Sequence, residues 1–196
     1  MSFLFGSIGM AQEAAPLKLA APADWGSETI KLPPGFAPDM KFTGVEHIRF
    51  APGMMKPTSD SFFSYAFAFE LEPQPALSEA VVKEEFLKYY RGLCTAVLKG
   101  KLPDLDTAAF KIALQRDATP APAEQNAKIA STLQRYAGTL DWIEPFATQK
   151  LQQLKLEIWT WTGPNRNYVF ACVSPQLLDA PIWRQLRAIR ADYCQQ

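Results

Sequence analysis

Histidine and cysteine, on which many catalytic and metal sites depend, are scarce in this sequence. Its 196 residues include one histidine, His47, and three cysteines, Cys94, Cys172 and Cys194. A structural zinc site needs about four such ligands, and these residues lie far apart along the chain. We therefore expect no zinc site, no other metal and no cofactor.

Short motifs of common catalytic and nucleotide-binding sites are also missing. The sequence contains no P-loop, dinucleotide-binding glycine pattern, HExxH, GxSxG or EF-hand loop. Because there is only one histidine, a Ser-His-Asp arrangement could use His47 alone. Catalysis is therefore not the first interpretation of this sequence.

No excess of one charge exists, and no long apolar run. Lys and Arg together number 20, as do Asp and Glu, so the formal net charge is zero. This balance provides no basic field for nucleic acid. No apolar run reaches the roughly 18–20 residues of a membrane span, so we expect neither nucleic-acid binding nor a spanning helix.

The first eleven residues have the character of the end of a secretory signal peptide. A short apolar stretch is followed by Gly9 and Ala11, small residues at the −3 and −1 positions of a cleavage site before Gln12. No basic residue precedes Lys18, which would be explained if Met1 lay inside a longer signal. The prediction is a periplasmic or secreted protein; the alternative is a simple apolar tail.

The composition is that of a globular chain, with 48% hydrophobic and 20% charged residues. Residues 12–41 are rich in Pro and Ala and are expected to form a tail and an irregular wrap, with one short strand at residues 28–32. Residues 42–196 are expected to form a single domain.

A near-repeat brackets the histidine: FAPDM at residues 36–40 and FAPGM at residues 50–54. Proline favours extended geometry in the residue before it, and Pro52-Gly53 suits a type II turn with positive φ at the glycine. We interpret the repeat as two turns around one strand. The stretch GVEHIRFAPG is similar to strands of exported bacterial proteins, a likeness that implies no particular activity.

Periodicity predicts the remaining elements. Residues 61–72 alternate large apolar with small or polar side chains, as a half-buried strand does. Helices are predicted at 78–99 and 180–194 from apolar stripes and capping residues. Further strands are expected at 108–115, 132–143, 150–162 and 167–174. The predicted fold class is α+β, a mostly antiparallel sheet of about six strands with both helices packed on one face.

The other sheet face is the predicted binding surface. If Leu154 and its even-numbered neighbours pack under the helices, four side chains point the opposite way: Lys155, Glu157, Trp159 and Trp161. Two Trp rings beside charged groups suit a stacking platform for a sugar or an aromatic ligand. The alternative is that the rings pack against Lys and Arg stems or under the wrap.

His47 and Arg49 are expected on the face opposite Ile48, as candidate ligand-binding residues or as solvated side chains. Glu70 and Glu72 are candidates for an acid/base pair. If the two helices pack side by side, Cys94 and Cys194 could form a disulfide.

The sequence therefore predicts an exported, non-catalytic protein that binds a small molecule or a protein partner on an open sheet face. Two alternatives stay open: a hydrolase or isomerase that uses carboxylates with His47, and an assembly protein whose tail engages a partner.

Overall fold

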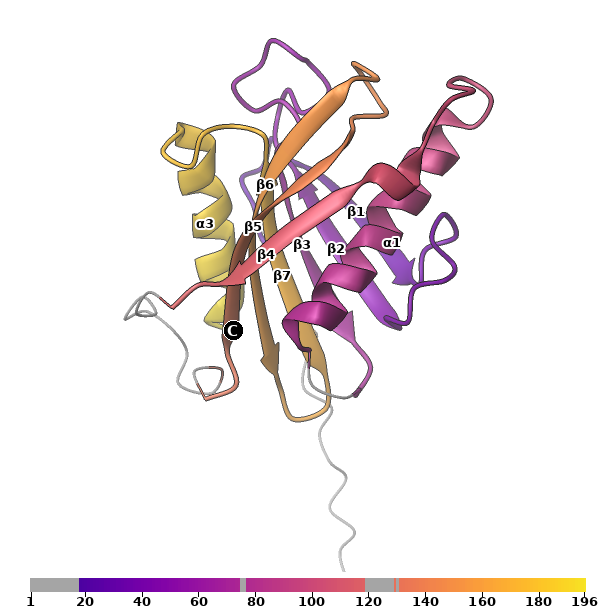
Figure 1. Cartoon of the computed structure of the whole chain (residues 1–196). Helices are drawn as coiled ribbons and strands as arrows, with labels where there is room; N and C mark the ends of the chain where they lie inside the picture. Colours follow the sequence, from indigo (N-terminus) through magenta and orange to yellow (C-terminus); the bar gives the residue numbers. More distant parts are fainter. Residues whose placement is uncertain (1–17, 75–76, 119–128, 130) are drawn as a thin grey trace, which may run out of the picture.

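The computed structural model describes residues 18–74, 77–118, 129 and 131–196. In these residues seven strands form one sheet in the order β1-β2-β3-β7-β6-β5-β4 (Figure 1). The strands are β1 (Gly26–Leu32), β2 (Gly44–Phe50), β3 (Tyr65–Leu71), β4 (Lys111–Arg116), β5 (Gln134–Ile143), β6 (Leu151–Thr162) and β7 (Asn167–Ser174). The helices are α1 (Glu79–Leu98), the short 3₁₀ helix η1 (Thr107–Ala109) and α3 (Pro181–Cys194).

The α+β class is confirmed, and every neighbouring pair of strands is antiparallel. The sheet has one strand more than the expected six or so. The additional strand is β1, which pairs with β2 along its whole length and which the sequence had indicated only as a short strand within the wrap.

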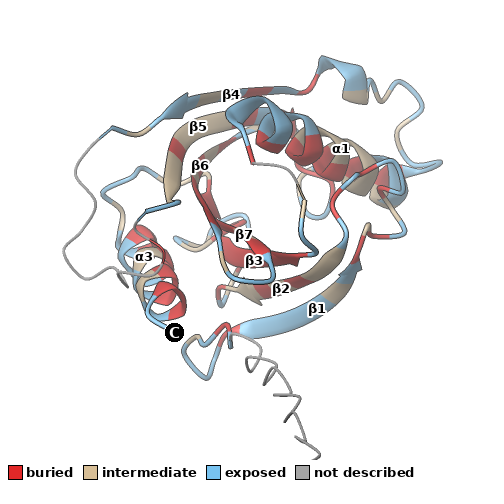
Figure 2. Cartoon of the chain, turned by 90° about the horizontal axis from the view of Figure 1, so that it is seen from below, coloured by how far each residue is buried: buried red, intermediate tan, exposed pale blue. Residues whose placement is uncertain are grey.

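The two helices lie on opposite faces of the sheet, so the prediction that both pack on one face is wrong. Helix α1 covers the face that carries Phe67 and Phe69, and Phe86 and Tyr89 of α1 contact these rings. Viewed along the sheet, the strands curve around α1, and α3 lies outside the curve (Figure 2).

Helix α3 packs on the other face because small side chains make room for it. Ala66 and Ala68 of β3 and Cys172 of β7 lie in the same buried cluster as Trp183 and Leu186 of α3. The alternation along β3 is therefore large against small rather than buried against exposed, and every residue of the strand is buried. A helix can approach a sheet closely where the intervening side chains are small.

The predicted turn after β2 is confirmed. Met54 donates a backbone hydrogen bond to the carbonyl of Ala51, and Gly53 has φ of 81°. That left-handed conformation favours glycine, and a Cβ at this position would lie 2.5 Å from the Oγ of Ser59.

Residues 18–41 contribute to the folded core. Leu19 and Trp25 are buried in the cluster under α3, and the backbone of Lys18 exchanges hydrogen bonds with the side chain of Gln196 near the end of the chain. The predicted signal segment, residues 1–11, lies outside the described residues.

The described part of the chain has no helix long and apolar enough to cross a membrane.

Candidate functional site

The two tryptophans of the predicted platform are covered. Trp159 and Trp161 are only 6% and 3% exposed, because α3 lies over this face. The Arg190 guanidinium lies 4.0 Å from the centroid of the Trp159 ring, and the Trp161 ring stacks on Tyr168 at 5.1 Å. The expectation of an open sheet face is therefore wrong, because other side chains of the protein pack against both rings.

The charged residues predicted beside the tryptophans hold α3 in place. Glu157 accepts hydrogen bonds from Arg187 at 2.6 and 3.0 Å and from Arg190 at 2.7 Å. Burial by itself would raise the pKa of the Glu157 carboxyl, but the hydrogen bonds and charges of the two arginines outweigh it and lower that pKa. Lys155 donates to the carbonyl of Pro175, before α3. These contacts stabilise the helix against the sheet.

His47 lies close to Glu70, one of the two carboxylates considered for acid/base work. The His47 Nε2 is 3.8 Å from the Glu70 Oε1, and its Nδ1 is 3.3 Å from the Thr29 hydroxyl. Glu70 is buried and also accepts a hydrogen bond from Tyr193 of α3 at 3.2 Å. The structure thus brings a hydroxyl, an imidazole and a carboxylate together on one face.

Two other predicted residues do not join this group. Glu72 lies beyond the end of β3, is exposed and accepts a hydrogen bond from Thr43. Arg49 donates to the carbonyl of the neighbouring Ile48, and burial lowers the pKa of its guanidinium. The pairing of Glu70 with Glu72 as acid and base therefore finds no support.

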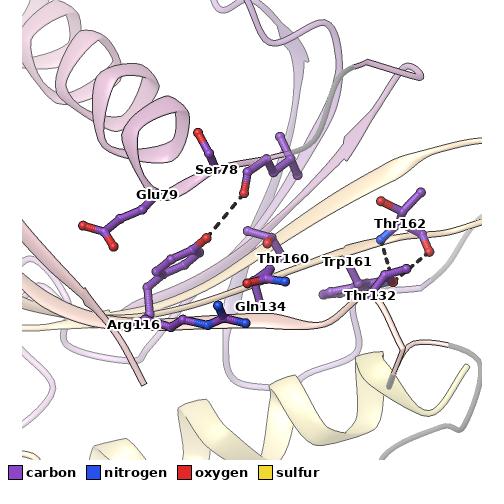
Figure 3. A pocket seen from close by; sticks show the side chains of 10 residues that line it. Ser78, Glu79, Arg116, Thr132, Gln134, Thr160, Trp161 and Thr162 are labelled. Carbon is purple, nitrogen blue, oxygen red and sulfur yellow. Dashed lines mark hydrogen bonds between the residues drawn. The ribbon is translucent and has the colours of Figure 1, made fainter. Parts of the chain in front are cut away.

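A cavity of about 510 Å³ opens at the end of the sheet where α1 begins. Four separate segments line it: the start of α1, the end of β4, the start of β5 and the end of β6 (Figure 3). The lining residues are Leu77, Ser78, Glu79, Arg116, Thr132, Gln134, Tyr136, Thr160, Trp161 and Thr162. Its volume lies within the range of about 300–1,000 Å³ typical of small-molecule sites.

The cavity has a buried interior and a polar rim. Leu77, Tyr136 and Thr160 are buried, whereas Glu79 and Arg116 are exposed at the edge. Such a combination of apolar surface with a few convergent polar groups is usual in ligand sites.

Several of these polar side chains are uncommitted, that is, they have no hydrogen-bond or ion-pair partner among the described residues. Within the described part of the chain, the side chains of Arg116, Gln134, Glu79 and Thr160 make no hydrogen bond or ion pair. Thr160 is only 1% exposed, but among the described residues its hydroxyl is not one of the fully buried side-chain atoms without a partner, which are Glu46 Oε2 and Gln74 Nε2. Its hydroxyl is therefore available to a partner that enters from the cavity.

The pKa of Tyr136 is affected by the two charged side chains at the edge of the cavity. Its hydroxyl donates to the carbonyl of Leu77 at 3.5 Å. Burial raises the pKa of the Tyr136 phenol, the charge of Glu79 raises it further, and the charge of Arg116 lowers it. Both charged side chains are therefore close enough to act on the same phenol.

This cavity was not predicted from the sequence, although the sequence contains one signal of it. The even-numbered positions of β6 are apolar at Leu154, Leu156 and Ile158 and become polar at Thr160 and Thr162. These five side chains share one face of the strand. A buried stripe that turns to hydroxyls at its end indicates a polar site there.

The cysteines do not form the predicted disulfide. Cys94 lies on α1 and Cys194 on α3, on opposite faces of the sheet, and all three cysteines are free. Burial raises the pKa of each thiol, to about 11 for Cys94 and about 12 for Cys172 and Cys194. In the described ranges no three His, Cys, Asp or Glu side chains are grouped in a way that could hold a metal ion.

Comparisons with protein families, with curated proteins and with solved structures found no match. The function of the candidate site is therefore inferred from its geometry alone.

Proposed function

We propose that this protein is a non-catalytic binding protein that holds a small polar ligand in the cavity at the end of the sheet. The observation that carries the proposal is Thr160, a buried residue whose hydroxyl makes no hydrogen bond within the described chain and lines a cavity of ligand size. A binding protein also needs little chemistry of its own, and the cavity lining contains no histidine or cysteine.

The proposal moves the predicted binding surface from the sheet face to the sheet end. The Trp159 ring is covered by Arg190 of α3, so a ligand would have to displace α3 to stack on it, whereas Trp161 also lines the cavity. The cavity needs no such displacement, because its rim is already exposed. Preformed sites of this kind avoid the free-energy cost of rearrangement on binding.

The test is an NMR titration of ¹⁵N-labelled protein with free amino acids, sugars and small organic acids. We expect at least one class to produce saturable shifts at the cavity residues. Thr160→Val, which keeps the shape but removes the hydroxyl, should weaken that binding about tenfold, as for the loss of one hydrogen bond. Thr139→Val, on β5 away from the cavity, is the matched control and should bind as the wild type does.

Two results would overturn the proposal. One is the absence of saturable shifts with every class. The other is saturable binding whose shifts map elsewhere and which Thr160→Val leaves unchanged.

We also propose that the protein is exported, as the signal-like residues 1–11 suggest. The intact mass of protein purified from its own host should lack these residues. A mass that includes them would refute cleavage after Ala11.

The contact between His47 and Glu70 favours a second candidate function, a hydrolase or isomerase that depends on a carboxylate and a histidine. An imidazole near a buried carboxylate can accept and return a proton. The test is hydrolysis of the activated ester p-nitrophenyl acetate. Activity lost in both His47→Ala and Glu70→Gln would support this candidate, and activity retained by either variant would exclude the pair.

A further inference from the structure

We infer that the ligand of the end cavity is a small zwitterion, a free amino acid or a short peptide, bound by its carboxylate at Arg116 and by its ammonium group at Glu79. This inference rests on the proposed function and specifies the ligand class of that same site.

The cavity rim carries a pair of opposite charges. Arg116 is the last residue of β4 and Glu79 is the first residue of α1, so they extend from different walls (Figure 3). Neither makes an ion pair in the described part of the chain, with the other or with a third group. A cation and an anion that face one cavity without neutralising each other are complementary to a molecule that carries both charges.

The remaining polar groups of the cavity lining also suit a zwitterion. The Gln134 amide and the Thr160 hydroxyl can each donate and accept hydrogen bonds, and they are paired across β5 and β6 in the sheet register. They can therefore serve either end of a zwitterion or the peptide group in its middle. Leu77 and the ring of Tyr136 are buried beside them and offer apolar contact to a short side chain.

Ligands with a single charge or none match this cavity less well. A simple anion would satisfy Arg116 but meet the carboxylate of Glu79, and a simple cation would meet the guanidinium. An uncharged sugar would displace water from both charges without replacing it by an opposite charge, which costs binding free energy. Arginine also recognises carboxylates with two parallel hydrogen bonds, which adds specificity.

The test is isothermal titration calorimetry with alanine, dialanine and trialanine, together with N-acetyl-trialanine and trialanine amide. The three lengths vary the separation of the charges, and each capped form lacks one charge. We expect one length of the zwitterion to bind best and each cap on trialanine to weaken binding at least tenfold. Lys111→Gln, on the same strand as Arg116 but outside the cavity lining, is the control and should bind as the wild type does.

Charge variants show which residue binds which end. Arg116→Gln should weaken binding of trialanine but leave binding of its amide unchanged, because the amide has no carboxylate to lose. Glu79→Gln should likewise weaken binding of trialanine but leave binding of N-acetyl-trialanine unchanged, because the acetylated form has no ammonium group to lose. A merely structural role would weaken all forms equally.

The outcomes separate the inference from the proposed function. If sugars or simple organic acids shift the cavity residues and the alanine series does not bind, or if capped and free forms bind equally, the zwitterion is wrong and the cavity remains a binding site. If nothing shifts the cavity residues, both proposals fail.

Discussion

Substitution of Glu46 by Gln should remove most of the pH dependence of stability between pH 5 and pH 8. Glu46 points from β2 towards α1, is 0% exposed and accepts a hydrogen bond from the Tyr89 hydroxyl at 3.1 Å. Its second carboxylate oxygen is buried and has no partner among the described residues. Burial raises the pKa of this carboxyl from 4.5 to about 8, against the lowering effect of the Tyr89 hydrogen bond, and the charge of Glu28 adds to the rise.

The direction of the pH dependence follows from the number of protons bound by the folded and the unfolded chain. Between pH 4.5 and about 8 the folded chain keeps a proton on Glu46 that the unfolded chain has released. The free energy of unfolding therefore falls as the pH rises, by about 1.4 kcal/mol per pH unit for one group. Over the whole window the loss is about 5 kcal/mol, and above pH 8 Glu46 contributes no further slope.

The variant Glu46→Gln cannot ionise, and its amide oxygen can still accept the hydrogen bond from Tyr89. The amide nitrogen would replace the unpartnered oxygen, a cost that does not change with pH. We expect the variant to have stability close to that of the wild type at pH 5 and to be several kcal/mol more stable at pH 8.

The assay is urea unfolding followed by tryptophan fluorescence at pH 5, 6, 7 and 8. Glu72→Gln, which changes an exposed carboxylate beyond β3, is the matched control and should keep the wild-type slope. Parallel pH curves for the wild type and Glu46→Gln would show that Glu46 is not held protonated in the fold and would refute the reasoning.

Three further predictions concern the packing of α3, a turn and the thiols. Glu157→Gln should reduce the free energy of unfolding at pH 7 by about 2–4 kcal/mol, between the values for exposed and buried ion pairs. Because the pKa of Glu157 is lowered in the fold, its contribution is present above pH 4.5 and is lost as the pH falls through that lower value. Urea unfolding at pH 7 and pH 3 should therefore show a smaller deficit at pH 3, and equal deficits would contradict the ion-pair account. Gly53→Ala should destabilise by about 1–2 kcal/mol in thermal unfolding because of its left-handed backbone, whereas Gly35→Ala, where an added Cβ meets nothing within 4 Å, should change stability by less than about 1 kcal/mol. All three cysteines should react with a thiol reagent only after unfolding, since each is buried and free; fast reaction in the native protein would show that one is accessible.

Much of the fold could be predicted because local patterns decide it. The alternation in residues 61–72, the apolar stripes of the helices and the Pro52-Gly53 turn depend on neighbours along the chain. The structure confirms the helices and the turn, and it places a strand at residues 65–71 that is buried on both faces and not half-buried as predicted. Side chains that share a face of a strand or helix are set by backbone geometry alone, so the sequence placed Trp159 and Trp161 correctly on one face, opposite Leu154.

Periodicity could not show what covers each face. Ala66 and Ala68 fit a solvated face and a closely packed helix equally well, and only the position of α3 distinguishes the two. The same holds for Glu157, which would be a solvated carboxylate without α3 and forms partly buried ion pairs with Arg187 and Arg190 when α3 is in place.

The candidate site was decided by the tertiary structure. Glu79, Arg116, Gln134 and Thr160 come from four segments, and only the strand order β6-β5-β4 and the position of α1 bring them to one cavity. Sequence by itself determined the elements, their faces and the absence of familiar catalytic motifs, because these depend on near neighbours. The covering of the faces and the convergence of uncommitted polar groups depend on contacts between distant segments, and no local pattern contains them.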